Sequence, residues 1–167
     1  MRSLLRLLAS LLVVAPIINS DAQGQAASDT LLEITGAVPQ PAKLTAAQIA
    51  QLPRRTVRIK EQSGSESEYE GVLLVDVLKQ AGVKFGEDLR GPALANFLVV
   101  EAADKYRAVF ALPELDPAFT DEVILLAERR DGKPLNANEG PLRIVIPAEK
   151  RHSRWVRQVV RLHIGKS

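Results

Sequence analysis

The sequence contains no cysteine and few of the other residues that carry metal or redox chemistry. Its 167 residues include two histidines, one methionine and one tryptophan. Without a thiol there is no disulfide framework, no thiolate metal ligand, no iron–sulfur cluster, no lipid-anchored cysteine and no cysteine nucleophile. Two histidines are also too few for a histidine-rich metal site. We therefore expect no metal ligands and assign no catalytic residue.

The chain also lacks a large excess of charge of either sign. Its 22 basic and 20 acidic residues give a formal net charge of +2, which is too small to indicate a nucleic-acid partner. The length is typical of one globular domain, whose core can bury about two-thirds of the unfolded surface. Composition alone indicates no specific function, so a more specific indication has to come from segments and motifs.

The N-terminal segment has the pattern of a secretory signal. Arg2 and Arg6 precede the apolar run Leu7–Ile18, and the small-x-small sequence Ser20-Asp21-Ala22 follows as a cleavage site. The apolar run has 12 residues, whereas a bilayer-spanning helix needs about 20. We therefore predict a signal peptide over residues 1–22, with an uncleaved membrane anchor as the alternative.

Removal of this signal predicts a periplasmic or secreted protein with no integral membrane span. We expect a flexible start over residues 23–30 and a single domain over residues 31–165. Residues 1–22 hold two of the 22 basic residues and one of the 20 acidic ones, so the mature chain keeps a net charge of +1. Arg2 and Arg6 stand apart and form no twin-arginine pair, so export is expected by the general, Sec-type route.

The hydrophobic pattern of the mature chain predicts an α+β domain in which strands dominate. Apolar or alternating runs predict strands at residues 31–34, 56–59, 97–100, 106–110, 123–127, 142–146 and 162–164. The 97–100 and 106–110 strands are expected to form a hairpin. Residues 61–70 are polar and predict a loop, and residues 131–134 predict a turn.

Helix signals are few and short. Thr45 and Gln48 form a capping box that starts a helix before Pro53. Apolar residues at 74, 75, 77, 78 and 81 line one face of a second helix, which stops at Gly82. Ser153 is expected to cap a third, which carries Val156 and Val159 inward. Two or three short helices and six or seven strands make β-rich mixed sheets.

Basic residues gather near the C-terminus. They are Arg143, Lys150, Arg151, Arg154, Arg157 and Arg161, accompanied by His152 and opposed by Glu149. On a helix, Arg154 and Arg157 would lie about 60° apart, beside the free amides that follow Ser153. Guanidinium groups and amides together make a phosphate-type anion site. The alternative is a solvated arginine face that covers Trp155 and pairs with acids of the 101–122 region.

The acidic residues and the histidines give weaker signals. The acids between residues 101 and 122 are Glu101, Asp104, Glu114, Asp116, Asp121 and Glu122. A pair of carboxylates can act as acid and base or bind a hard cation, but no calcium-loop spacing is present and turn roles are favoured. His163 is expected on the exposed face of the last strand. His152, at the mouth of the basic segment, is a candidate donor to an anion.

Several short motifs then follow one another in a characteristic order. They are Leu32-x-Ile34-x-Gly36, Leu44-Thr45, Leu52-Pro53, Gly71–Leu74, Val77-Leu78, Ala81–Val83, Ala102–Tyr106, Leu112–Leu115, Gly140–Pro147 and Arg154–Arg157. Over about residues 31–164 this order resembles the oxidoreductase molybdopterin-binding domain family, which has the sulfite-oxidase fold. The most specific part is the closing stretch from Gly140 to Arg157.

The resemblance implies a mixed, β-rich fold and a role for the closing basic segment. In that family, basic residues of this segment help to hold the anionic phosphate of the pterin cofactor. Carried over to this chain, the resemblance names Arg151, His152, Arg154 and Arg157 as cofactor-binding residues. It therefore points to the same segment as the charge pattern.

The sequence departs from the family where the chemistry would take place. Catalytic members supply a cysteine thiolate to molybdenum from the loop after the strand equivalent to residues 56–59. Here that loop has no cysteine, and neither Glu61 nor Ser63 reproduces a soft thiolate ligand. A cofactor inserted in the cytoplasm also requires twin-arginine export of folded protein, and the twin-arginine pair is missing.

These observations predict a binding module that lacks redox chemistry and carries no cofactor. Its partner would be an anionic small molecule or a periplasmic protein. The first alternative is a molybdopterin-dependent oxidoreductase whose metal has an oxygen ligand such as Glu61. The second is a purely structural secreted domain, in which Arg154→Ala and Arg157→Ala would change no binding.

Overall fold

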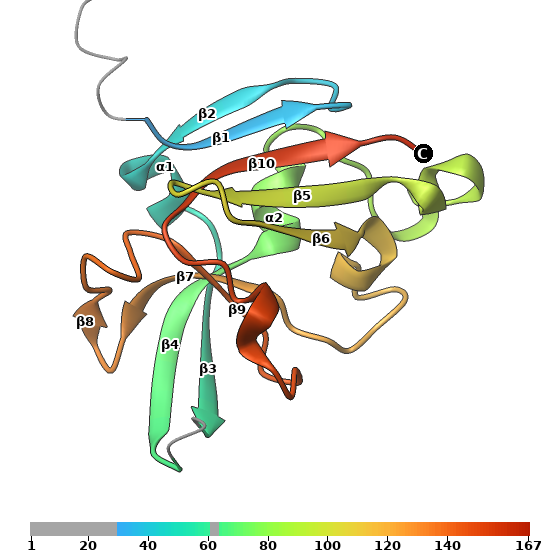
Figure 1. Ribbon diagram of the computed structural model, residues 1–167. Coiled ribbons are helices and arrows are strands. Elements are labelled where there is room, and N and C mark those ends of the chain that lie inside the picture. The colour runs from blue at the N-terminus through green and yellow to red at the C-terminus, as the bar shows by residue number, and fades with distance from the viewer. Residues whose placement is uncertain (1–29, 61–63) are drawn as a thin grey trace, which may run out of the picture.

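A computed structural model describes residues 30–60 and 64–167, and in it two β-sheets share one hydrophobic core (Figure 1). The predicted signal peptide, and the predicted flexible start up to residue 29, lie outside the described residues. Glu61 and Ser63, the candidate replacements for a metal-binding cysteine, also lie outside them.

The first sheet has five strands in the order β2-β1-β10-β5-β6. They are β1 (Thr30–Gly36), β2 (Ala42–Thr45), β5 (Phe97–Ala102), β6 (Arg107–Ala111) and β10 (Val159–Gly165). β1 and β10 are parallel and every other neighbouring pair is antiparallel, so the sheet is mixed. The C-terminal strand therefore lies in the middle of the sheet, between the first strand and the β5–β6 hairpin.

The second sheet is antiparallel and has the order β3-β4-β7-β8. Its strands are β3 (Arg54–Lys60), β4 (Glu66–Leu73), β7 (Leu125–Arg130) and β8 (Lys133–Pro134), with β9 (Arg143–Val145) also paired to β7. The β3–β4 hairpin extends away from the body of the domain (Figure 1). The β7–β8 turn contains Asp131 and Gly132, both at positive φ, as the Asp-Gly pair favours.

The helices are short, and none in the described part of the chain is long and apolar enough to span a membrane. They are α1 (Ala46–Ala50), α2 (Leu74–Lys79) and the single 3₁₀ turns η1 (Gly86–Asp88), η2 (Gly91–Ala95), η3 (Leu112–Leu115) and η4 (His152–Arg154). The predicted capping box is present, because Thr45 Oγ1 accepts from the Gln48 amide at 3.2 Å and Gln48 Oε1 accepts from the Thr45 amide at 2.8 Å.

The core fills the space between the two sheets. Its largest fully buried side chains include Tyr69 from β4 and Phe110 from β6. α2 contributes the apolar face that its sequence predicts, with Leu74, Val77 and Leu78 fully buried. The predicted class, β-rich mixed sheets with short helices, is confirmed.

One sequence prediction about strands is wrong, and one strand was missed. The polar residues 61–70 were expected to form a loop, but β4 begins at Glu66. Ser67, Tyr69 and Gly71 are buried and alternate with more exposed residues, so the segment has the period of two of a strand beneath a polar composition. β2 was not predicted, because its four residues follow the prolines that favoured an extended link.

The C-terminal basic segment also differs from its prediction. η4 is one turn of three residues, its N-cap is Arg151, and Ser153 lies inside it without capping. Val156 and Val159 are buried as expected, but Val159 begins β10. The predicted 60° separation of Arg154 and Arg157 therefore does not apply. β9 is buried on both faces rather than half-buried, and its Arg143 is only 8% exposed.

Gly71 is required where β4 and β7 approach closely. A Cβ at this position would lie 2.1 Å from the Leu126 carbonyl oxygen, beside an irregularity in the β4–β7 register. We expect Gly71→Ala to lower the free energy of unfolding by about 2–3 kcal/mol, because backbone atoms have to shift. Gly86→Ala, which meets open space at φ +66°, is the control and should cost about 1 kcal/mol. Urea denaturation measures both, and equal losses would contradict the clash.

Candidate functional site

The C-terminal basic residues do not form one cluster in the folded protein. Arg143, Arg154 and Arg161 are each paired with carboxylates. Arg151 and Arg157 are exposed and make no ion pair within the described residues. The basic segment therefore contains two kinds of arginine. Some are neutralised by carboxylates of the same chain, and others are exposed to solvent.

Arg154 is held by two carboxylates and an aromatic ring. Its Nε lies 2.5 Å from Glu149 Oε1, and its Nη1 lies 2.8 Å from Glu114 Oε2. The guanidinium also lies over the Phe110 ring, 4.6 Å from the centroid. Partial burial opposes the charged form, but the hydrogen bonds to Glu114 and Glu149 outweigh burial and raise the pKa of Arg154.

Arg161 belongs to a row of alternating charges across the open face of the first sheet. It donates to Glu33 Oε2 at 3.2 Å and to Glu101 Oε1 at 3.2 Å, and the strand register places these residues side by side. A hydrogen bond from Lys105 lowers the pKa of Glu101, and the charges of Arg161 and Arg107 act in the same direction. Arg161 therefore links β10 to both of its neighbours in the sheet, β1 and β5.

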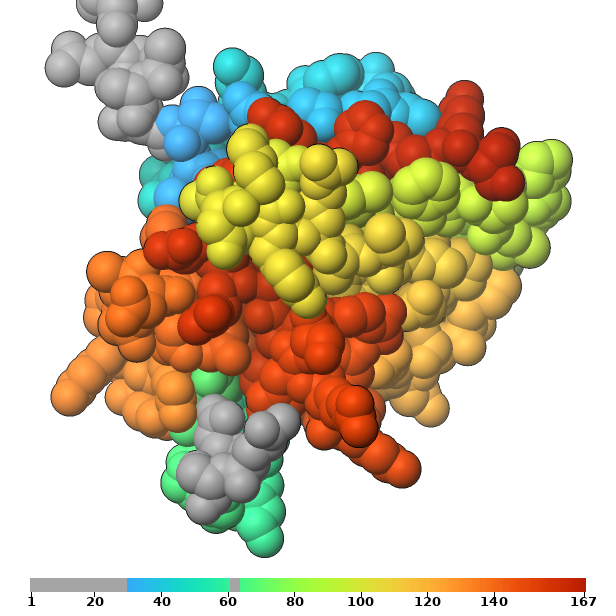
Figure 2. Space-filling view, in the orientation of Figure 1, coloured from blue at the N-terminus to red at the C-terminus, as the bar shows by residue number. Residues whose placement is uncertain are grey.

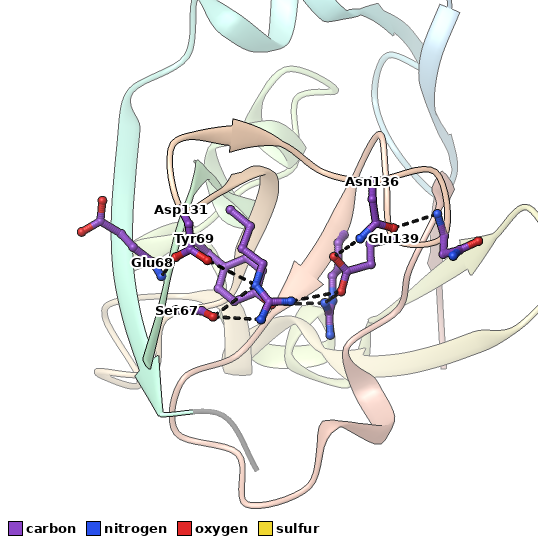
Figure 3. A network of polar contacts seen from close by, with 9 residues as sticks. Ser67, Glu68, Tyr69, Asp131, Asn136 and Glu139 are labelled. Atoms are coloured by element: carbon purple, nitrogen blue, oxygen red, sulfur yellow. Dashed lines mark hydrogen bonds and ion pairs between the residues drawn. The ribbon is translucent and has the colours of Figure 1, made fainter. Parts of the chain in front are cut away.

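Arg143 belongs to a largely buried polar network with Tyr69 and Glu139, both of which are labelled in Figure 3. Its Nη1 donates to Glu139 Oε1 and, at 3.2 Å, to the hydroxyl of Tyr69. The guanidinium lies 5.6 Å from the Tyr69 ring centroid and 5.4 Å from that of Trp155. The pairing with Glu139 balances a charge that burial would otherwise make costly.

His152 stacks on Trp155 beside this network. Their ring centroids are 3.6 Å apart and the planes are inclined by 13°. The Tyr106 hydroxyl donates to the Ser153 carbonyl at 2.7 Å, which fastens η4 to the β5–β6 turn. Figure 2 shows this turn, in yellow, against the red-orange segment that contains η4.

A cavity of about 260 Å³ opens between these segments. Its walls are Ala102, Asp104, Tyr106, Asn138, His152, Ser153, Trp155, Val156, Arg157 and Gln158. Of the four residues predicted to bind a cofactor, His152 and Arg157 line the cavity. Arg151 precedes η4 and Arg154 faces its two carboxylates, so neither lies in the wall.

The cavity presents charges of both signs. Arg157 contributes a cation, and Asp104 contributes a carboxylate whose Oδ1 accepts from the Tyr106 amide at 2.9 Å. Gln158 has a φ of +51°, which is held because its amide donates to the Glu139 carbonyl and its carbonyl accepts from the Ala103 amide. The arrangement suits a small polar molecule that carries an anionic group and hydrogen-bond donors.

Sequence analysis did not identify the other polar residues of the cavity wall as binding residues. Asp104 was predicted as a turn residue and has that role. Tyr106 was noted only as the end of a family motif and the start of a strand, and Asn138 and Gln158 carried no signal of their own. Asp116 is also structural, since its oxygens accept from the Gly86 and Ala118 amides at 2.6 and 2.9 Å. Within the described residues, no group of three or more histidine, aspartate or glutamate side chains is arranged to hold a metal ion.

Comparison with known proteins identifies a family and a fold. The sequence pattern of the oxidoreductase molybdopterin binding domain matches residues 21–167. The chain matches no curated protein. It is similar to the crystal structure of the sulfane dehydrogenase SoxCD from Paracoccus pantotrophus, with a TM-score of 0.64 and 24% identity over 81% of this chain. The match spans 38% of that longer chain, and at this identity it establishes a shared fold alone.

The residues present do not fit a molybdenum cofactor held by a thiolate. The sequence has no cysteine, and the oxygen groups that remain are poor substitutes for a soft ligand. Arg143 and Arg154, the two most buried arginines of the closing segment, already carry carboxylate partners. The cavity beside His152 and Arg157 has polar walls that carry one cationic and one anionic side chain.

The internal pairing of Arg154 predicts a difference between two neighbouring arginines. Arg154→Ala should lower the free energy of unfolding by about 2 kcal/mol, because Glu114 and Glu149 lose their shared partner. Arg157→Ala should change it by less than about 0.5 kcal/mol, because the side chain is exposed and unpaired among the described residues. Chemical denaturation of the two variants tests this, and a larger loss for Arg157→Ala would contradict the assignment.

Proposed function

The chain belongs to the oxidoreductase molybdopterin-binding domain family, and we propose that it is a member without redox chemistry that binds an anionic small molecule. The binding site is the cavity between the β5–β6 turn and residues 152–158. Arg157 pairs with the anionic group, and His152 contributes a ring nitrogen. Asp104 accepts hydrogen bonds from donor groups of the same ligand.

The observation that carries this proposal is that the arginines of the basic segment differ in their ion pairing. Arg143 and Arg154 are neutralised by the chain's own carboxylates, whereas Arg157 lines a cavity and has no ion pair within the described residues. An unpaired guanidinium beside polar walls favours an external anion, and the pairing is stronger where the cavity removes water.

The proposed setting of this activity is the periplasm or the extracellular space. The Sec-type signal over residues 1–22 supports export, and the missing cysteine supports the loss of the metal ligand. In this proposal the exported domain presents its ligand, or its ligand-bound surface, to a periplasmic partner protein. In this proposal the domain binds no nucleic acid, and it has no membrane span after the signal is cleaved.

Two related heterocycles test the charge of the site. Pterin-6-carboxylate carries an anionic group and a flat ring edge with donors, while pterin has the same ring without the carboxylate. We expect the wild-type protein to bind pterin-6-carboxylate more tightly than pterin. Arg157→Ala should weaken binding of the carboxylate about tenfold and leave pterin binding unchanged, because one charge-assisted hydrogen bond is lost.

Isothermal titration calorimetry measures both ligands, and Arg58→Ala is the matched control. Arg58 is an exposed arginine on β3, paired with Glu68 at 3.0 Å and outside the cavity wall. Equal affinity of wild type and Arg157→Ala for pterin-6-carboxylate would contradict the role of Arg157. Absence of binding of both ligands would count against a small-molecule site of this chemistry.

Metal and pterin analysis separates the proposal from an oxidoreductase. Protein purified from its native compartment should contain neither molybdenum nor pterin in stoichiometric amount, because no thiolate holds the metal. Elemental analysis and fluorescence of the oxidised pterin measure the two components. One molybdenum and one pterin per chain would instead support an enzyme with an oxygen ligand such as Glu61.

A further inference from the structure

The edge strands of the two sheets differ in how they are protected from pairing with another strand. In the first sheet, β2 has four residues and follows Pro41, and at the end of β6 the Ala111 amide donates to Glu114 at 3.1 Å. In the second sheet, β8 has only two residues and includes Pro134. Short strands, prolines and side-chain caps are the means by which proteins block unwanted strand pairing.

The edge strand β3 has none of these features. It pairs with β4 along all seven of its residues without a shift of register, and it contains neither proline nor glycine. Within the described residues, no strand pairs with its other edge. The β3–β4 hairpin extends away from the body of the domain, and Thr56, Arg58 and Lys60 are exposed (Figure 1). β3 is therefore a regular edge that is long enough to pair with a further strand.

The hydrogen bonds of Glu68 indicate which backbone groups of β3 point outward. The Glu68 amide donates to Asp131 Oδ1 and its carbonyl accepts from the Asp131 amide, each at 2.8 Å, so both groups face β7 rather than β3. Arg58 lies opposite Glu68, and the two residues are therefore a pair that exchanges no ladder hydrogen bonds. The amide and carbonyl of Arg58 consequently point to the open edge, as do those of Thr56 and Lys60, two residues away on either side.

Charges alternate in sign from strand to strand on the sheet face that carries these side chains. Arg129 of β7 lies opposite Glu70 of β4, and Arg58 of β3 donates to Glu68 of β4 at 3.0 Å. The Arg58 side chain is nevertheless 79% exposed, and Lys60 makes no ion pair with any described residue. Opposite charges on neighbouring strands stabilise a sheet, so a strand that continues this alternation beside β3 would be acidic.

The other face of β3 favours apolar side chains. Val57 is half-buried and Ile59 is 6% exposed. A strand that alternates acidic and apolar residues would therefore match both faces of β3. A second copy of β3 does not match, because three of its four outward-pointing residues are basic and cations would meet cations.

We propose that the open edge of β3 binds an extended segment of a partner protein in which acidic residues alternate with apolar ones. The segment adds a strand to the second sheet, and its main chain pairs with the outward amides and carbonyls of Thr56 and Arg58. Its acidic side chains lie beside Arg58 and Lys60. This surface is separate from the proposed cavity, whose walls contain no residue of β3.

Two end-capped peptides of the length of β3 test the charge of the partner. One alternates valine with glutamate and the other alternates valine with lysine, so they share a preference for strands and differ in charge. Fluorescence anisotropy of the labelled peptides measures their binding to the protein. We expect the glutamate peptide to bind at least about tenfold more tightly than the lysine peptide. Equal binding of the two peptides would overturn the proposal.

Thr56→Pro tests the main-chain pairing, with Thr56→Ala as its matched control. Proline removes an amide that faces the open edge and no hydrogen bond of the β3–β4 ladder, so the fold is retained. Thr56→Pro should weaken binding of the glutamate peptide at least about tenfold, whereas Thr56→Ala should change it less than about twofold. Unchanged binding by a folded Thr56→Pro variant would overturn pairing at this edge.

A charge variant keeps the test decisive if Thr56→Pro does not fold. Arg58→Ala combined with Lys60→Ala should weaken binding of the glutamate peptide about tenfold. Its control is Lys84→Ala combined with Arg90→Ala, which removes one exposed lysine and one exposed arginine outside both sheets and should leave binding unchanged. Equal losses in the two double variants would overturn the proposal, since the effect would then be one of general charge.

Sedimentation velocity of the protein without peptide tests the remaining occupant, a second copy of the chain. We expect a monomer at the concentrations used for the peptide measurements, because the outward basic residues of two copies repel each other. A dimer that dissociates in the Thr56→Pro variant would assign the edge to a second copy and overturn the acidic partner.

Discussion

Arg143 is the buried charge around which β4 and β9 of the second sheet meet the segment after η4. Its guanidinium lies against the rings of both Tyr69 and Trp155, and Glu139 supplies the balancing carboxylate. A buried guanidinium without a partner is strongly unfavourable, so these four side chains have to meet in one arrangement. They come from β4, the turn before β9, β9 itself and the segment after η4, which fixes how the chain that leads into β10 packs against the second sheet.

This constraint also shapes the proposed binding cavity. Trp155 is held beside Arg143 and offers its other contacts to His152, whose ring stacks on it. The Glu139 carbonyl accepts from the Gln158 amide and thereby helps to hold that residue at positive φ in the cavity wall. The Arg143–Glu139 pair thus helps to position the polar groups of the neighbouring cavity. Arg157 is left as the cation in the cavity wall.

Much of the fold was predictable because local patterns agree with the tertiary structure. The Thr45–Gln48 capping box and the apolar face of α2 need only their own segments, and both formed as expected. β4 was missed because its polar composition concealed an alternation that matters only when β3 and β7 pair with it. The helix expected after Ser153 was wrong because the chain is instead held by Trp155 packing and by the Tyr106 hydrogen bond.

The sequence by itself determined the family, the β-rich class and the absence of a thiolate, since these depend on residue identity and order. It also located the basic segment from residue 143 to residue 161. Only the tertiary structure decided which of those arginines is available, because the balancing carboxylates Glu33, Glu101 and Glu114 are distant in sequence. Charge on an arginine is local, but its neutralisation depends on which strands become neighbours.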